Sequence, residues 1–478
     1  MEADQTEKTV EKSPKKRRVA SRTRRIVWGI LLGLLLLPIL LILLLYTPPV
    51  QRFALRKVLK EVSASTGMTI VAGDFRLAFP LRLRLQDVSA VNQKGDTVVG
   101  VGRLQTTLSP LSLLNQRVEA HRLELERVRV FMPDKDSTLV IAAAAEALSI
   151  GPLSVDLRKE RVDAGSLRYA DGYFKLYMRK KEQKEEKPVR WIIDANRIVL
   201  EHTLFDMAMP DDSLFVRADM QQANVEDFSM NLEDTRVQSN RISVTSGETY
   251  YSTNLALEAT DRVNYSDLHA ETLSAEITDF VQQGSLLKGN IVSLAMQERS
   301  GACVKHFRGA LAMEDGLLGL DNFALQTDES SLSGSIRLPF ALFRGDTTER
   351  AALLLRGSLS DSDIYRFSGQ SVTDLLGSSA GTHPFELDID AEGNKDVIAI
   401  RRLNVERQGI LKVDLRGKVT KVANPSLRNG EITLDALMQP AVSGIITRFA
   451  PGMKGQLSIP RNTRLKLKAG IKGRHYTA

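Results

Sequence analysis

Several stretches of the chain alternate apolar and polar residues with a period of two, which is typical of strands with one buried face. The first lies between Thr69 and Val91, where the apolar positions are Phe75, Leu77, Phe79, Leu81, Leu83 and Leu85. The same alternation returns at 123–130, 332–340, 385–391, 411–419 and 465–471. Pro80 divides the first stretch into two strands, and a phase break between Leu125 and Val128 predicts a β-bulge. Turn residues separate these segments, so we expect a mainly β fold with an elongated, repetitive antiparallel sheet.

A few segments follow a helical period instead. Residues 49–66 place apolar side chains three or four apart and are followed by Gly67, which predicts a short amphipathic helix. Segments 280–287, 364–376 and 445–453 also look helical, and each precedes a glycine that opens a strand. We therefore expect short crossover helices and loose internal repeats, clearest in 280–478.

The run Ile26–Tyr46 contains no charged side chain. At about 1.5 Å per residue it reaches roughly 31 Å, enough to cross the hydrocarbon core of a bilayer as one transmembrane helix. Trp28 and Tyr46 stand at its two ends, where aromatic rings prefer the lipid headgroups. A cleaved signal peptide is the alternative, but the run is longer than such peptides have and lacks a small-residue cleavage site.

Basic residues are more frequent before this run than after it. The 15 preceding residues include eight Lys or Arg, Arg24 and Arg25 among them, and the 15 following residues include four. The positive-inside rule therefore predicts a cytoplasmic N-terminus. The basic stretch 14–19 also resembles a nuclear-import signal, but its charges are already explained by the predicted membrane topology. We expect a basic tail (1–25), a transmembrane helix (26–46), an amphipathic helix (47–67) and one long β region (68–478).

Composition excludes several classes of protein. The net charge of +7 includes +5 from residues 1–25, so no basic face for nucleic acid is indicated. The single cysteine, Cys303, excludes a disulfide scaffold, and the six histidines are scattered without a metal-binding spacing. Residues 377–381 match the G-x-S-x-G nucleophile motif around Ser379, but they follow a helical segment and read as a Gly/Ser loop. We expect no enzyme, no cofactor and no metal site.

Residues 20–135 carry an ordered set of short motifs. They are Thr66-Gly67, Phe79-Pro80-Leu81, Leu85-x-Asp87-Val88 and Gly95-Asp96-Thr97, placed after a basic tail and one apolar run. In this order they resemble the N-terminal module of TamB/AsmA-type proteins. The resemblance beyond residue 135 is one of architecture only.

The resemblance implies a bridge-like lipid-transfer protein of a Gram-negative envelope, anchored in the inner membrane with its bulk in the periplasm. Its sheet would form an open groove along which phospholipid acyl chains pass. A role in outer-membrane protein assembly and secretion is also implied. TamB-like chains end in a module that meets an outer-membrane β-barrel assembly protein, and no segment here resembles that module.

Taken alone, the alternation leaves two arrangements open: an open groove, or a closed sandwich or barrel core in a membrane-tethered scaffold or binding protein. A membrane-anchored enzyme that uses Ser379 is a third hypothesis. The resemblance favours the groove. The residues that we expect to line it are Leu77, Phe79, Leu83, Leu85, Leu332, Ile336, Leu338, Leu411, Val413 and Leu415.

Overall fold

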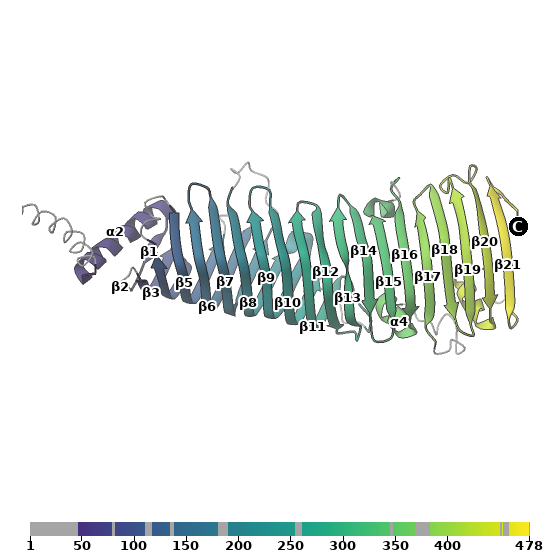
Figure 1. Cartoon of the computed structure of the whole chain (residues 1–478), viewed down its shortest axis with the longest axis horizontal. Coiled ribbons are helices and arrows are strands. Elements are labelled where there is room, and N and C mark those ends of the chain that lie inside the picture. Colours follow the sequence, from purple (N-terminus) through teal and green to yellow (C-terminus); the bar gives the residue numbers. More distant parts are fainter. Residues whose placement is uncertain are drawn as a thin grey trace, which may run out of the picture.

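The computed structural model shows a long single sheet that carries a few short helices (Figure 1). It describes residues 46–78, 82–109, 117–133, 138–179, 190–253, 261–344, 348–369, 383–449, 452 and 458–477. The 22 strands of these residues follow one another along the sheet in sequence order, except that β3 pairs with both β1 and β2. Only β7 and β8 are parallel. The expected mainly β, antiparallel fold is confirmed.

The strands of the first half become long after β4. Their bounds are β1 Thr69–Val71, β2 Asp74–Ala78, β3 Arg82–Val91, β4 Thr97–Leu108, β5 Arg117–Pro133, β6 Leu139–Asp156, β7 Arg161–Met178, β8 Ile192–Met209, β9 Leu214–Asn231, β10 Arg236–Ser252 and β11 Asp267–Gln283.

The strands of the second half are shorter. Their bounds are β12 Leu286–Glu298, β13 Cys303–Glu314, β14 Leu317–Gln326, β15 Ser331–Pro339, β16 Ala351–Leu359, β17 Phe385–Gly393, β18 Val397–Arg407, β19 Leu411–Thr420, β20 Asn429–Met438, β21 Thr463–Lys472 and β22 His475–Thr477. The helices are α2 Pro48–Thr66, α4 Asp361–Ser368 and α6 Ser443–Phe449, with 3-10 turns η1 Pro210–Asp212, η2 Phe340–Arg344 and η4 Pro440–Val442.

Helix α2 covers the first edge of the sheet. It starts at a proline and ends at Gly67, whose φ of 67° is left-handed, as the sequence predicts. The buried Gln51 side chain donates to the Leu77 carbonyl oxygen (2.8 Å) and accepts from the Leu77 amide (3.2 Å), so it pairs with β2 as a further strand would. An exposed sheet edge invites unwanted pairing, and here a helix occupies that position.

The apolar run before α2 lies outside the described residues, apart from Tyr46. None of the helices in the described ranges is both long enough and apolar enough to span a bilayer. Arg24, Arg25 and Trp28 likewise lie outside these ranges.

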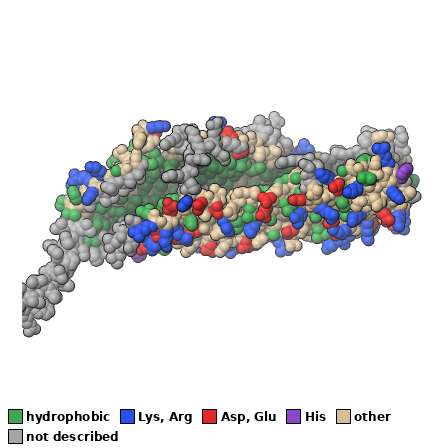
Figure 2. All heavy atoms as spheres, turned by 90° about the horizontal axis from the view of Figure 1, so that it is seen from above, with side chains coloured by type: hydrophobic (Ala, Val, Ile, Leu, Met, Phe, Trp, Pro, Cys, Tyr) green, Lys and Arg blue, Asp and Glu red, His purple; other side chains and the backbone are tan. Residues whose placement is uncertain are grey.

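The long strands bend twice, and the bends turn the sheet into a trough (Figure 2). In β7 the apolar positions are even-numbered up to 164, odd-numbered at 167 and 169, and even-numbered again from 172. The second change falls on Asp171, whose left-handed φ of 53° is one that Asp, Asn and His adopt more readily than other side chains. Arg127 in β5 (φ 50°) and His202 in β8 (φ 44°) occupy corresponding positions. Because neighbouring strands bend together, the sheet folds along lines that run across its strands.

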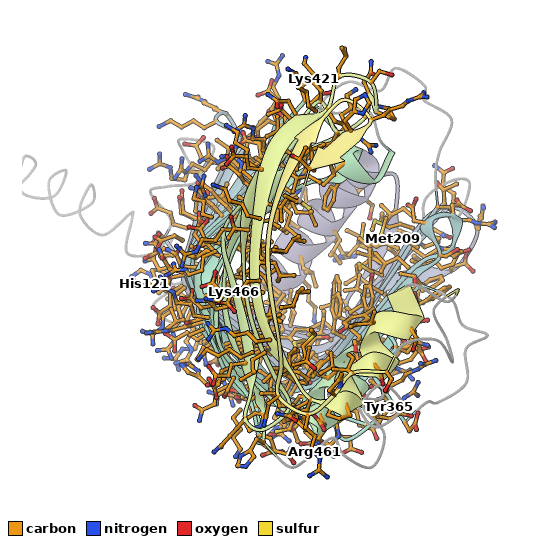
Figure 3. All side chains as sticks on the ribbon, turned by 90° about the vertical axis from the view of Figure 1, so that its right-hand side faces the viewer. His121, Met209, Tyr365, Lys421, Arg461 and Lys466 are labelled. Carbon is orange, nitrogen blue, oxygen red and sulfur yellow. The ribbon has the colours of Figure 1, made fainter. Side chains whose placement is uncertain are left out.

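Seen from the C-terminal end, the sheet has a curved cross-section that stays open on one side (Figure 3). His121 and Lys466 point outward from the convex side. Since successive side chains of a strand alternate between faces, Leu465 and Leu467 belong to the concave side. In the described residues β22 pairs with β21 alone, so the sheet does not close into a barrel, and the predicted alternative of a closed core is wrong.

Two local predictions are also wrong. Segment 280–287 is not helical, because β11 and β12 meet there in a turn at Gly284, whose φ is 55°. The phase break between Leu125 and Val128 is not a bulge, because β5 keeps its register with both neighbours from Leu123 to Val130. The left-handed Arg127 reverses the side-chain phase instead. The other two predicted crossover helices correspond to α4 and α6, although residues 370–376 lie outside the described ranges.

Helix α4 is fixed to the sheet by buried polar contacts. Ser360 caps its first turn by accepting from the Asp363 amide (3.1 Å). The Asp363 carboxylate accepts from the hydroxyls of Thr327 and Ser330, both at 2.5 Å. Arg407, which is 1% exposed, forms a bidentate ion pair with Asp361 and stacks on the Phe385 ring at 4.7 Å. These contacts hold α4 against the strand ends of the second half.

Candidate functional site

One unbroken line of registered partners crosses the sheet on its concave side, with one residue from each strand between β2 and β21. We call it the apolar row. Its members, in order, are Phe75, Leu85, Leu104, Leu125, Leu148, Tyr169, Leu200, Ala223, Val244, Ala275, Leu294, Phe307, Leu325, Leu332, Gly357, Leu387, Val405, Val413, Ala436 and Leu465. At about 4.8 Å between strands, the apolar row is about 90 Å long.

The apolar row contains no charged side chain, and its only polar side-chain atom is the Tyr169 hydroxyl. That oxygen lies 2.5 Å from the carbonyl oxygens of both Ala144 and Tyr173, so a backbone acceptor satisfies it. Burial raises the pKa of Tyr169 to about 12, which keeps the hydroxyl neutral at physiological pH. The row therefore presents a continuous hydrocarbon surface.

A second apolar line runs beside the first through the long strands. It consists of Leu77, Leu83, Thr106, Leu123, Ile150, Leu167, Ile198, Val225, Ile242, Ile277 and Ile291, of which Thr106 alone has a polar side-chain atom. Because side chains two apart on one strand share a face, the two lines together form a broad apolar floor.

Bulky members of the apolar row are only half-buried. Leu465 is 42% exposed, whereas the alanines Ala223 and Ala436 are each 3% exposed. An uncharged apolar row that runs from β2 to β21 is a longer apolar strip than soluble monomers usually leave uncovered, and it marks a binding surface.

An apolar cavity lies in the trough near its C-terminal end. The cavity, of about 400 Å³, is lined by side chains of β18 to β21, including Ile400, Leu415, Val419, Ile432 and Ile471. It opens directly onto the apolar row, since Leu415 is two residues from Val413.

The structure brings most of the expected lining residues together. Leu85, Leu332 and Val413 belong to the apolar row, and Leu77 and Leu83 to the line beside it. Ile336 pairs with Leu320 and Leu353, Leu338 with Leu318, Leu411 with Met438, and Leu415 with Leu403 and Leu434. Phe79 lies outside the described residues.

Sequence reasoning missed the lining of the middle strands, among them Leu148, Leu200 and Leu294. Each long strand changes phase at its bends, so no alternation there persists for more than a few residues. The sequence does contain a signal for these bends: the apolar alternation restarts in the opposite phase after a residue that adopts a left-handed φ readily, as it does after Asp171 and His202.

The convex face is polar and pairs its charges across strands. Examples are Arg103 with Glu126 (3.1 Å), Arg241 with Glu276 (2.7 Å) and Arg464 with Asp435 (2.8 Å). The hydrogen bond from Arg464 holds the pKa of Asp435 below its usual range. The sheet therefore has a charged convex face and an apolar concave face.

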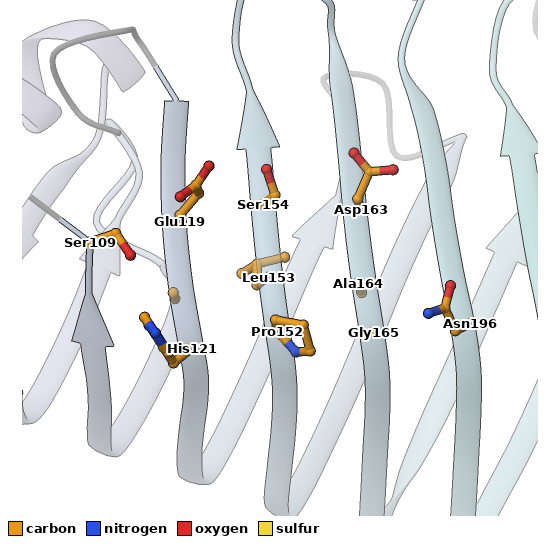
Figure 4. Close-up of a pocket in the computed structure, with 11 residues that line it drawn as sticks. Ser109, Glu119, His121, Pro152, Leu153, Ser154, Asp163, Ala164, Gly165 and Asn196 are labelled. Carbon is orange, nitrogen blue, oxygen red and sulfur yellow. The ribbon is translucent and has the colours of Figure 1, made fainter. Parts of the chain in front are cut away.

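A depression with a mixed polar and apolar lining also lies where the strands β5 to β8 bend (Figure 4). Glu119, His121, Asp163 and Asn196 contribute to it. Its two carboxylates already form ion pairs with arginines: Glu119 lies 3.7 Å from Arg117, and Asp163 lies 2.9 Å from Arg161. Across the described ranges, no group of three His, Cys, Asp or Glu residues could hold a metal ion. Ser379 is outside those ranges.

Comparison of the chain with protein-family models, with curated proteins and with solved structures gives no match.

Proposed function

We propose that the protein is a non-enzymatic, membrane-anchored conduit for phospholipid, in which acyl chains occupy the trough. The continuity of the apolar row carries this proposal. A binding pocket for one ligand needs a local apolar site with a few polar contacts, whereas this row crosses every strand from β2 to β21 without a charge. Acyl chains that move along a surface need hydrocarbon contact everywhere and specific polar contacts nowhere.

Several parts of the proposal come from the sequence. The apolar run 26–46 serves as the transmembrane anchor, with Arg24, Arg25, Trp28 and Tyr46 at its ends. The N-terminus is cytoplasmic, and the trough lies in the periplasm of a Gram-negative cell between inner and outer membrane. These assignments follow the charge asymmetry and the resemblance to TamB/AsmA-type proteins. Outer-membrane protein assembly and contact with a β-barrel partner remain expectations from that resemblance.

Site-specific photocrosslinking tests the conduit. A benzophenone amino acid at Leu83 or Leu415 faces the trough, whereas the same group at Glu124 or Arg416 lies on the exposed convex face, outside the α2 end of the sheet. Ultraviolet irradiation of living cells, followed by mass spectrometry of the purified protein, identifies attached lipid. We expect phospholipid adducts at the two leucine positions and none at Glu124 or Arg416. Equal yields on both faces, or no adduct at any inward position, would count against the proposal.

Topology is tested separately with the single native cysteine. Cys303 is partly exposed and can react with a maleimide. If the β region is periplasmic, a maleimide that cannot cross the inner membrane should label Cys303 in cells whose outer membrane has been permeabilised. Labelling that appears only after the inner membrane is lysed would place the β region in the cytoplasm and reverse the proposed orientation.

A further inference from the structure

Cations gather at the end of the molecule that carries α2 (Figure 2). We call this group the basic collar. It consists of Arg52, Arg56, Lys57 and Lys60 of α2, Arg76 of β2, and Arg82 and Arg84 of β3, and all seven are exposed. Residues 47–91 contain these seven cations against three acidic residues, a net charge of +4, whereas residues 92–478 have a net charge of −2.

The basic collar lacks ion pairs of the kind that Arg103, Arg241 and Arg464 form elsewhere on the convex face. Among the side chains that the structure describes, no carboxylate lies within 4.0 Å of any of its seven cations, and Arg84 donates to the Gln105 amide oxygen (3.2 Å). Arg76 and Arg84 are registered partners and stand directly opposite each other. Like charges in that position destabilise a sheet, and anions that bind between them would relieve the repulsion.

The outward face of α2 adds an apolar anchor. Gln51 fixes the orientation of the helix through its two hydrogen bonds to Leu77, which turns Phe53 away from the sheet. Phe53 is 66% exposed, and Lys57 follows one turn later on the same face. An exposed aromatic residue among lysines and arginines is typical of helices that lie in the headgroup region of a membrane.

We propose that the basic collar binds the anionic phospholipid headgroups of the membrane that anchors the chain, and holds the α2 end of the trough against that leaflet. The inference rests on the anchoring part of the proposed function, because the apolar run 26–46 ends two residues before α2. Guanidinium groups form bidentate hydrogen bonds with phosphate, and the lysines add charge without a fixed geometry. Acyl chains would thereby meet the apolar row at Phe75, the member nearest the membrane.

Fluorescence quenching in vesicles tests this docking with the full chain. In a Cys303→Ser background, Ala78→Cys places a fluorophore on the exposed face of β2 between the collar arginines. The protein is reconstituted into phosphatidylcholine vesicles with or without 30 mol% phosphatidylglycerol, both containing a lipid with a nitroxide on its headgroup. We expect at least twofold stronger quenching in the anionic vesicles, and loss of that difference in high salt, because salt screens surface charges.

Matched variants locate the effect. Replacement of Arg76, Arg82 and Arg84 by Gln removes collar charge, and replacement of Lys418, Lys468 and Lys472 by Gln removes the same charge at the far end. The first variant should abolish the difference between vesicles and the second should keep it, with unchanged circular dichroism in both. Equal quenching with and without anionic lipid, or equal effects of both variants, would overturn the docking. Failure of the protein to float with either kind of vesicle would instead overturn the anchor.

Discussion

A charge placed in the middle of the apolar row should interrupt the path that lipid follows. Leu294 pairs with Ala275 and Phe307 on the concave side of β12, about halfway along the row. The substitution Leu294→Asp removes a half-buried leucine, which costs about 1 kcal/mol of stability by burial of apolar area, so the sheet should still fold. Covering the new carboxylate with an acyl chain would cost several kcal/mol, because its water is lost and no cation replaces it.

This cost sets the expected size of the effect. At 1.4 kcal/mol per factor of ten, a penalty of about 3 kcal/mol lowers lipid occupancy at that point by roughly 150-fold. Photocrosslinking from two reporter positions can detect this. With a benzophenone at Leu83, on the anchor side of the block, phospholipid capture should persist in Leu294→Asp. With a benzophenone at Leu415, beyond the block, capture should fall below detection.

Lys288→Asp is the matched control. Lys288 lies on the same strand but is exposed on the opposite face, since its neighbours Leu287 and Gly289 pair with Met313 and Leu311. The control introduces the same side chain without changing the apolar row, so phospholipid crosslinking from Leu83 and from Leu415 should both stay unchanged. Undiminished capture at Leu415 in a folded Leu294→Asp protein would refute the idea that lipid moves along the row.

Three further predictions concern stability and ionisation. Arg407→Ala removes a buried guanidinium and leaves Asp361, whose side chain is 33% exposed, without its ion-pair partner, so it should lower the free energy of unfolding by about 1.5–3 kcal/mol. Arg416→Ala, whose partner Asp414 is exposed, should change it by less than about 1 kcal/mol, and urea denaturation compares the two variants. Gly334→Ala would bring the new Cβ within 1.8 Å of the Leu354 carbonyl oxygen and should lower the free energy of unfolding by about 2 kcal/mol or more. Gly319→Ala, whose Cβ would have its nearest contact at 3.6 Å, should leave the stability unchanged. Similar denaturation midpoints for the two variants would contradict the packing of β15 on β16. Tyr169 should ionise near pH 12 in ultraviolet titration. Since its folded pKa lies above the unfolded value of about 10, its contribution to stability is present below pH 10 and lost as the pH rises from 10 to 12, and Tyr169→Phe should remove that loss.

The ends of the sheet were more predictable than its middle. At 411–419 and 465–471 the strands are short and keep one phase, so alternation alone places Val413 and Leu465 on the apolar faces of their strands, and both pair with Ala436. In β5 to β11 the phase reverses at each bend, and a pattern with two reversals in 18 residues resembles no single period. The apolar residues around Gly284 have a helix-like spacing only because a tight turn brings two strands together in sequence.

The path of the apolar row was beyond sequence reasoning for a different reason. A row is defined by partners on neighbouring strands, such as Leu148 with Tyr169 and Tyr169 with Leu200, and those pairings depend on the register of every hairpin. The choice between an open trough and a closed core also depends on whether the last strand meets the first. Local sequence patterns contain neither piece of information.

The most direct test of the account is a cryo-electron microscopy map of the full-length protein, purified with its native lipids. We predict elongated non-protein density on the concave side of the sheet that follows the apolar row past Leu148, Leu294 and Val413. A map in which the two rims of the trough meet and protein side chains fill the space between them would contradict it.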